Sequence, residues 1–228
     1  MLPVLRVMFL LGLFVALLPA STAARAAKRC FPETKQCIDG RFEEFWTQNG
    51  GLPVFGFAIT AQANETNRDT GKKIPTQWME RNRFESHPEN KAPYDVLLGR
   101  LGDDRLRQLG RDWQKEPRES GQKAGCLWFE QTGHNVCNQS GSIGFRTYWE
   151  THGLEFDGQP GTSYAESLAL FGLPLTEPKV ELNTSRDRVV TQWFERARFE
   201  YHPNKPAEFK VLLGLLGNEV RFKWAAPR

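Results

Sequence analysis

The chain has 228 residues, of which 39% are hydrophobic and 25% charged, and 30 Lys and Arg residues nearly balance 27 Asp and Glu residues. A net charge of +3 is too small for a protein that depends on phosphate contacts, so the composition argues against nucleic-acid binding. The length suffices for one domain or for two small ones.

The first 26 residues have the pattern of a secretory signal peptide. Arg6 precedes an apolar run from Val7 to Leu18, and a stretch of small residues ends at Ala26. We expect cleavage near Ala26. The apolar run is too short to span a bilayer, and no later segment is apolar enough to do so. The sequence therefore predicts a secreted or cell-envelope protein without a membrane span.

Four cysteines in an exported chain predict two disulfides, because the compartment is oxidising. Cys30 and Cys37 lie at the front of one repeat, and Cys126 and Cys137 lie at the front of the next. We therefore expect the local bonds Cys30–Cys37 and Cys126–Cys137. Metal binding is the alternative, but these spacings are not typical of a zinc site, and we predict no metal site.

A duplication organises the mature chain. Residues 76–102 align without a gap on residues 191–217, and 17 of the 27 positions are identical. The match continues upstream in the same order, from FPET to FEQT, from FEEFWTQNGG to FRTYWETHG and from FGFAIT to FGLPLT. We predict a first repeat module at 27–110, a charged linker at 111–125 and a second module at 126–228. The second module carries an insertion at 154–170.

Each module begins with a short aromatic helix. Phe42, Phe45 and Trp46 are spaced i, i+3 and i+4, which places three aromatic rings on one helical face. Phe145, Tyr148 and Trp149 repeat the pattern, and Gly50 and Gly153 follow as terminating glycines. We expect these rings in the core.

A β-hairpin follows in each module, in the segments TQWMERNRFESHP and TQWFERARFEYHP. Two-residue turns at Arg81-Asn82 and Arg196-Ala197 would place Met79 opposite Phe84, and Phe194 opposite Phe199. The His-Pro pairs end the second strand. The VLLG segments are short strands or helix starts, which periodicity does not separate. The sequence thus predicts an α+β protein of two homologous small modules, each a short helix plus an antiparallel hairpin or sheet.

The turn FGLPLT at Phe171, a polar spacer and Gln-Trp-Phe at Gln192 resemble the LGFP repeat of bacterial envelope proteins. Phe replaces the leucine of that repeat, Ala58 replaces its proline in the first copy, and Glu-Arg-Asn/Ala-Arg replaces its glycine turn. The whole unit is similar to repeats in exported proteins of filamentous bacteria such as the Chloroflexi. The resemblance implies envelope localisation and attachment to wall glycan or another surface polymer.

Binding residues are predicted on the hairpins. Trp78 and Trp193 lie on the hairpin face opposite Met79 and Phe194, so they are either core or exposed platforms for sugar rings. The candidate ligand-binding residues are these tryptophans and the neighbouring arginines: Trp78, Trp193, Arg81, Arg83, Arg196 and Arg198.

The rival hypothesis is an extracellular glycan hydrolase that uses the carboxylates and histidines of the repeated ERxRFExHP motif, namely Glu80, Glu85, His87, Glu195, Glu200 and His202. Each carboxylate has an arginine neighbour, which favours an ion pair over a general acid. Serine-hydrolase, zinc-protease, phosphate-loop and dinucleotide motifs are missing, so no cofactor is expected. We predict a non-catalytic binding or structural protein whose tandem repeats hold cell-wall or extracellular polysaccharide, because two weak sites raise avidity.

Overall fold

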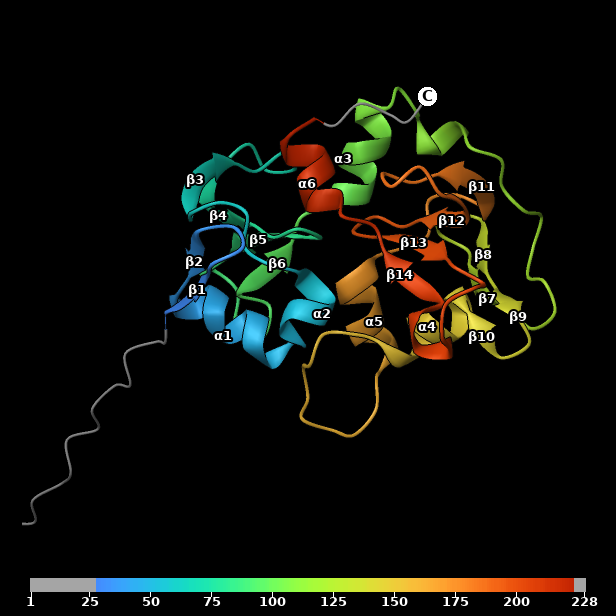
Figure 1. Ribbon diagram of the computed structural model, residues 1–228, viewed down its shortest axis with the longest axis horizontal. Helices are drawn as coiled ribbons and strands as arrows, with labels where there is room; N and C mark the ends of the chain where they lie inside the picture. The colour runs from blue at the N-terminus through green and yellow to red at the C-terminus, as the bar shows by residue number, and fades with distance from the viewer. Residues whose placement is uncertain (1–27, 224–228) are drawn as a thin grey trace, which may run out of the picture.

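The computed structural model describes residues 28–223 (Figure 1). The signal peptide predicted for residues 1–26 lies outside these residues. The described chain forms two halves side by side, each with helices and one four-stranded antiparallel sheet. This arrangement confirms the predicted α+β class; the module and linker boundaries stay predictions.

The first half begins with a two-stranded hairpin and two helices, continues with a meander of four antiparallel strands and closes with a helix. In chain order its elements are β1 (Arg29–Phe31), β2 (Gln36–Ile38), α1 (Gly40–Gln48), α2 (Gly51–Phe55), β3 (Ala63–Thr66), β4 (Lys73–Trp78), β5 (Arg83–Ser86), β6 (Val96–Leu98) and α3 (Leu101–Gln108). The sheet order is β3-β4-β5-β6, so β3 and β6 are its edges.

A connection with the 3-10 helix η1 (Trp113–Lys115) leads to the second half, which repeats the plan with one additional hairpin. Its elements are β7 (Leu127–Phe129), β8 (His134–Val136), β9 (Asn138–Ser140), β10 (Ile143–Gly144), α4 (Phe145–Thr151), α5 (Tyr164–Phe171), β11 (Lys179–Leu182), β12 (Arg188–Trp193), β13 (Arg198–Tyr201), η2 (Ala207–Phe209), β14 (Val211–Leu213) and α6 (Leu216–Arg221). The VLLG segments are therefore strands, each followed directly by a helix.

The two predicted disulfides, Cys30–Cys37 and Cys126–Cys137, are both confirmed. Each closes the hairpin at the front of its half, and a buried glutamine ties that hairpin to the sheet. In the first half the Gln77 side-chain amide donates to the carbonyl oxygens of Cys37 (2.8 Å) and Thr60 (2.9 Å). Gln192 makes the equivalent bonds, which explains why the glutamine of the TQW segment recurs.

The aromatic helices are core elements, as predicted. Phe42, Phe45 and Trp46 of α1 are all buried. In α4, Phe145 and Trp149 are buried, and the ring of Tyr148 packs edge-on against Phe199 with ring centroids 5.1 Å apart. Burial raises the pKa of Tyr148 to about 12, because the charged phenolate is poorly solvated there.

The hairpin is confirmed, but its predicted register is wrong by two residues. Gln77 pairs with Phe84 and Trp78 with Arg83, so Met79 does not lie opposite Phe84. The second copy has the same register, with Trp193 opposite Arg198. A shift of two residues keeps every side chain on its predicted face of the sheet, and the Phe194 and Phe199 rings still meet diagonally, 4.3 Å apart.

The hairpin turn is centred on Glu80-Arg81 because the Phe-Gly segment binds it there. The Glu80 N–H donates to the carbonyl oxygen of Phe57 (3.0 Å), and the Arg81 N–H donates to that of Phe55 (3.1 Å). The Glu80 carboxylate accepts the N–H of Phe57 in return (3.1 Å). Gly56 has a φ of 76°, and a Cβ there would lie 2.5 Å from a Glu80 oxygen, so only glycine fits.

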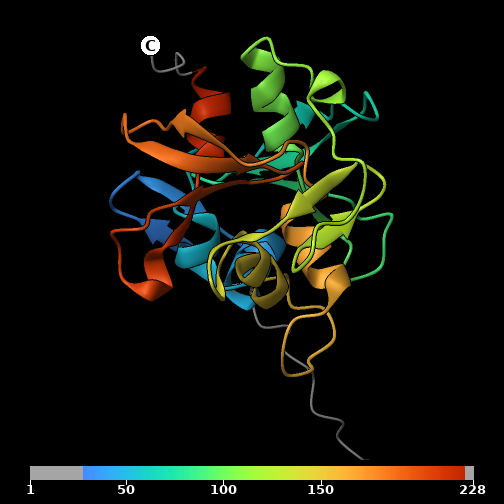
Figure 2. The ribbon, with the colours of Figure 1, turned by 90° about the vertical axis from the view of Figure 1, so that its right-hand side faces the viewer.

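The halves exchange their closing helices. The Gly102 N–H at the start of α3 donates to the carbonyl oxygen of Glu195 in the other half (3.0 Å). The Asn218 N–H at the start of α6 donates to the carbonyl oxygen of Glu80 (3.2 Å). Helices α3 and α6 lie side by side in both views (Figures 1 and 2). Each hairpin turn is thus held by the helix of the other copy.

Two hydrophobic clusters cover the two faces of the sheets. The larger cluster contains residues of both halves, including Phe45, Phe84, Trp149 and Phe199. The smaller lies beneath the exchanged helices and is formed by residues from both copies: Trp78, Leu101, Leu106, Leu175, Trp193, Leu216 and Val220. The halves therefore share their core.

Candidate functional site

The two tryptophans predicted as ligand platforms lie in the interior. Trp78 is 5% exposed and Trp193 is 2% exposed, because the exchanged helices cover both rings. Each indole N–H donates to a glutamate, Glu65 at 3.0 Å and Glu181 at 2.9 Å. Of the two alternatives for these rings, core residue or exposed platform, the structure shows the core residue.

Arg83 and Arg198 accompany the tryptophans, but their guanidinium groups are occupied by ion pairs. Each lies over the neighbouring indole at 5.0 Å from the ring centroid. Arg198 is buried, and it contacts Glu200 at 2.6 Å and Glu219 at 2.8 Å. Neither arginine is available to a ligand in this arrangement.

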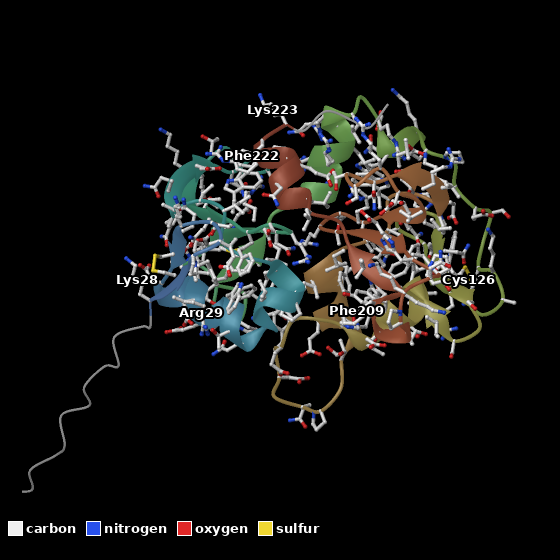
Figure 3. All side chains as sticks on the ribbon, viewed as in Figure 1. Lys28, Arg29, Cys126, Phe209, Phe222 and Lys223 are labelled. Atoms are coloured by element: carbon white, nitrogen blue, oxygen red, sulfur yellow. A yellow bond between two sulfur atoms is a disulfide. The ribbon has the colours of Figure 1, made fainter. Side chains whose placement is uncertain are left out.

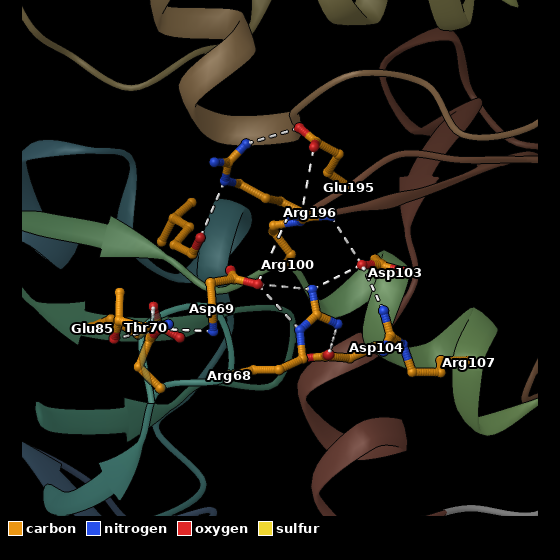
Figure 4. A network of polar contacts seen from close by, with 12 residues as sticks. Arg68, Asp69, Thr70, Glu85, Arg100, Asp103, Asp104, Arg107, Glu195 and Arg196 are labelled. Carbon is orange, nitrogen blue, oxygen red and sulfur yellow. Dashed lines mark hydrogen bonds and ion pairs between the residues drawn. The ribbon is translucent and has the colours of Figure 1, made fainter. Parts of the chain in front are cut away.

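The carboxylate at the start of each closing helix is neutralised by two arginines. In the first half Asp104 contacts Arg83 (3.2 Å) and Arg68. Figure 4 shows Asp104 beside Arg68 in a larger network of charged residues. In the second half Glu219 contacts Arg198 from its own half and Arg105 (3.2 Å) from α3 of the other half. The charges are balanced within the fold.

Arg81 and Arg196 lie at the hairpin turns, away from the tryptophans. The Arg81 Nη1 donates to the carbonyl oxygen of Leu52 (3.3 Å). The Arg196 Nε donates across the interface to the carbonyl oxygen of Leu98 (3.1 Å), and its Nη1 contacts Glu195 (3.4 Å). Burial lowers the pKa of Arg196. The six predicted residues therefore lie in two separate places: the tryptophans with Arg83 and Arg198 beneath the closing helices, and Arg81 and Arg196 at the hairpin turns.

The residues of the hydrolase hypothesis are also engaged in structural contacts. Glu85 accepts hydrogen bonds from Arg83 Nε (2.7 Å) and Asn67 Nδ2 (2.9 Å), and it is 6% exposed. Glu200 has the equivalent partners, Arg198 and Asn183. The Nε2 atoms of the motif histidines lie 3.8 Å (His87) and 3.5 Å (His202) from these carboxylates. These contacts stabilise the strands, as the ion-pair interpretation expects.

Exposed aromatic rings occur at one repeated position that the sequence analysis did not single out. Tyr94 is 50% exposed, and Phe209, its partner in the gapless alignment, is 53% exposed. Tyr94 precedes β6, and Phe209 precedes β14 in the same way. The alignment of the two copies offered a signal for this position: both have an aromatic residue there, and it lies outside the apolar spacing of the predicted helices and strands.

A groove of about 460 Å³ lies where the two halves meet, and we call it the inter-repeat groove. One wall is β6 with Tyr94, and the opposite wall is the insertion, which comprises a loop and most of α5. The ring of Phe156 in the insertion packs against that of Tyr94, with ring centroids 5.0 Å apart. The groove is lined chiefly by apolar side chains, with the polar groups of Gln131, Glu195 and Arg196.

No family model, curated protein or solved structure matches this chain. The two disulfides indicate an oxidising compartment outside the cytoplasm. Among residues 28–223, no helix is both long and apolar enough to cross a bilayer.

In two further hollows, at least half of the lining residues are charged. One of about 490 Å³ adjoins η1 and is bordered by Arg100, Arg107 and Arg111, with acidic residues among them. The other, of about 390 Å³, lies over Trp193 and contains the paired Arg198 and Glu219. Their charged groups already have protein partners, so the inter-repeat groove is the better candidate for binding.

The one acidic cluster with metal-like spacing in the described part of the chain consists of Glu155, Asp157 and Glu166. Its carboxylates hold the insertion together: Glu166 accepts the N–H groups of Ser163 (2.7 Å) and Phe156 (2.9 Å). These backbone hydrogen bonds lower the pKa of Glu166. The cluster therefore has a structural role in the loop.

Proposed function

We propose that this protein is a non-catalytic, exported binding protein that holds an extracellular or cell-wall polysaccharide through one aromatic ring in each repeat. The observation that carries the proposal is the pair Tyr94 and Phe209, which are aligned in the two copies and half exposed. An aromatic ring offers a flat apolar surface to the C–H face of a sugar ring.

The repeat explains how two weak contacts serve one ligand. A single ring contributes of order 1 kcal/mol, which gives low affinity alone. Two rings on one chain can engage two sugars of the same polymer, so the second contact forms at high effective concentration. Such a ligand has to be repetitive, which favours a polysaccharide over a small molecule.

The signal peptide predicted for residues 1–26 and the resemblance to LGFP repeats belong to the same proposal. Both support a mature protein that lies in the cell envelope and attaches to wall glycan. The engaged carboxylates of Glu85 and Glu200 support a non-catalytic role over glycan hydrolysis.

The test is co-sedimentation with insoluble, protein-free bacterial cell-wall glycan. Tyr94→Ala and Phe209→Ala should each weaken binding roughly fivefold, the equivalent of about 1 kcal/mol. The double variant should lose more than either single variant, because avidity is lost as well.

The matched control is Phe222→Ala. Phe222 is 54% exposed but aligns with no aromatic residue in the first copy, and Figure 3 shows it well apart from Phe209. This variant should bind like the wild type. Equal binding by all variants, each with an unchanged thermal transition, would exclude Tyr94 and Phe209 as the binding residues.

A further inference from the structure

A second hollow at the meeting of the two halves lies where the aromatic helices α1 and α4 end. It has a volume of about 230 Å³, and we call it the helix-end hollow. The aligned segments 48–50 and 151–153 both border it, so each copy contributes the same position. Glu155 and Glu166 of the insertion complete it, and the loop of the insertion projects from the molecule in both views (Figures 1 and 2).

The charges around the helix-end hollow favour a cation. Two glutamates line it, and none of the described residues that line it is lysine or arginine. The last turns of α1 and α4 contain no basic residue, so no side chain of those turns offsets the negative ends of the helix dipoles. Negative groups gathered in a hollow attract cations, and they hold them more strongly than the same groups on an open surface do.

Glu155 is held at the hollow with one carboxylate oxygen available. Its N–H donates to the side-chain oxygen of Asn49 at the end of α1 (2.6 Å), which ties the insertion to the other half. Its Oε1 accepts the N–H of Gly158 (2.7 Å), whereas Oε2 has no hydrogen bond with the described residues. Glu155 is exposed, so a ligand can reach this oxygen.

His152 presents a second acceptor. Its Nδ1 lies 2.9 Å from the carbonyl oxygen of Tyr148, which only accepts hydrogen bonds, so Nδ1 carries the proton. Partial burial lowers the pKa of His152, because the charged imidazolium is poorly solvated there, and the neutral ring has a lone pair on Nε2. This Nε2 has no hydrogen-bond partner among residues 28–223, so it can accept one from a ligand.

The spacing of these acceptors suits an organic cation better than a metal ion. In the described part of the chain, the one group of three ligand residues with atoms within 4.8 Å of one another is Glu155, Asp157 and Glu166. His152 does not belong to it, so it does not complete a coordination sphere with these carboxylates. Metal–ligand distances are about 2.0–2.6 Å, whereas an ammonium nitrogen binds its acceptors at about 2.9 Å and brings carbon atoms that occupy further volume.

The remaining lining favours a sugar as the carrier of the ammonium group. The apolar side chains at the hollow are those of Val54, Leu154 and Leu170, and the other lining residues are polar or glycine. The apolar stem of a lysine side chain would therefore face polar groups over most of this surface. A sugar has hydroxyl groups that form hydrogen bonds with such a lining.

We propose that the helix-end hollow binds an amino sugar whose amine is not acetylated, with its ammonium group between Glu155 and the Nε2 of His152. Glu155 balances the charge. The last carbonyl oxygens of α1 and α4 lack intrahelical partners, as at the end of any helix, and accept hydrogen bonds from the sugar hydroxyl groups. The inference does not rest on Tyr94 and Phe209, which lie outside this hollow.

The experiment titrates glucosamine into the full disulfide-bonded chain and follows the backbone amide signals by NMR at about pH 6.5, where the amine is protonated. The signals of residues 48–50 and 151–155 should move. N-acetylglucosamine, which lacks the charge, should bind about tenfold more weakly or worse. Nα-acetyl-lysine amide, the probe for a peptide ligand, should also bind more weakly than glucosamine. Tyr94→Ala and Phe209→Ala should bind glucosamine like the wild type, which separates this site from the polysaccharide contact.

Gln48→Lys places an ammonium group of the chain itself at the hollow, so it should abolish glucosamine binding. Its control is Thr47→Lys, which adds the same charge to the same last turn of α1 but does not border the hollow, and this variant should retain binding. Glu155→Gln keeps an oxygen for the Gly158 hydrogen bond and should weaken binding about tenfold, so it serves if Gln48→Lys does not fold. The inference is overturned if the signals at the hollow do not move, if N-acetylglucosamine or the lysine probe binds as tightly as glucosamine, or if the folded variants Gln48→Lys and Glu155→Gln bind normally.

Discussion

Gly217 should be required for the exchange of helices between the halves. It lies at the second position of α6, where alanine would ordinarily be the better helix former by about 1 kcal/mol. A Cβ at this position, however, would lie 1.8 Å from the Met79 carbonyl oxygen and 3.0 Å from that of Glu80. A Cβ at Gly102 would lie equally close, 1.8 Å, to the Phe194 carbonyl oxygen, so the requirement is reciprocal.

The size of the stability loss follows from the displacement of α6 that the added methyl group would require. Ordinary carbon–oxygen contacts are about 3.3 Å or longer, so α6 must shift away from backbone atoms by more than about 1 Å. Overpacking costs about 1–3 kcal/mol, here at the upper end because a main chain yields less than a side chain. Losing the Asn218–Glu80 hydrogen bond adds about 1 kcal/mol. After the helix-propensity gain, Gly217→Ala should lower the free energy of unfolding by about 3 kcal/mol.

Urea denaturation followed by tryptophan fluorescence measures this change. Gly121→Ala is the control, because a Cβ there meets nothing within 4 Å, and its stability should change by less than about 0.5 kcal/mol. An unchanged or raised midpoint for Gly217→Ala would mean that α6 does not dock on the hairpin turn of the first half.

Two other predictions concern the core and the insertion. Phe199→Ala should destabilise the protein by about 3–5 kcal/mol in the same assay, because the ring is fully buried and packs edge-on against Phe171, 4.7 Å away; a loss below about 1 kcal/mol would contradict this packing. Hydrogen bonds from Ser163 and Phe156 hold the pKa of Glu166 below its ordinary value, so its stabilisation is complete above about pH 4.3 and lost as the pH falls through the lower folded value. The hydrogen-exchange protection factors of residues 154–163, which correct for the intrinsic pH dependence of exchange, should therefore fall in acid in the wild type, whereas in Glu166→Gln they should already be low at pH 7.

Local features of the fold could be predicted from the sequence because their causes are local. The disulfides close loops within one repeat, and the aromatic spacing of α1 and α4 defines a buried face without distant information. The hairpin register could not be obtained in this way. Registers two residues apart expose the same faces, and the deciding contacts come from the Phe55-Gly56-Phe57 segment more than twenty residues away in the chain.

The candidate site was harder to predict, because its parts come from both repeats. The burial of Trp78 depends on Leu216 and Val220, which belong to the other copy. A periodicity argument within one hairpin finds an aromatic side chain on a free face and does not reveal the helix that covers it. The inter-repeat groove likewise joins β6 to an insertion some sixty residues later in the chain.

The exchanged helices also bear on how such a protein could originate and diverge. In a chain with a single repeat, neither the hairpin turn nor the closing helix would have its packing partner. Two such chains could supply these partners to each other by pairing around a two-fold axis. Joining the copies in one polypeptide preserves this two-fold arrangement, and the sequence of each copy can then change independently. The insertion in the second copy shows the result: a symmetric ancestor would carry every surface feature twice, whereas the fused chain holds one asymmetric groove.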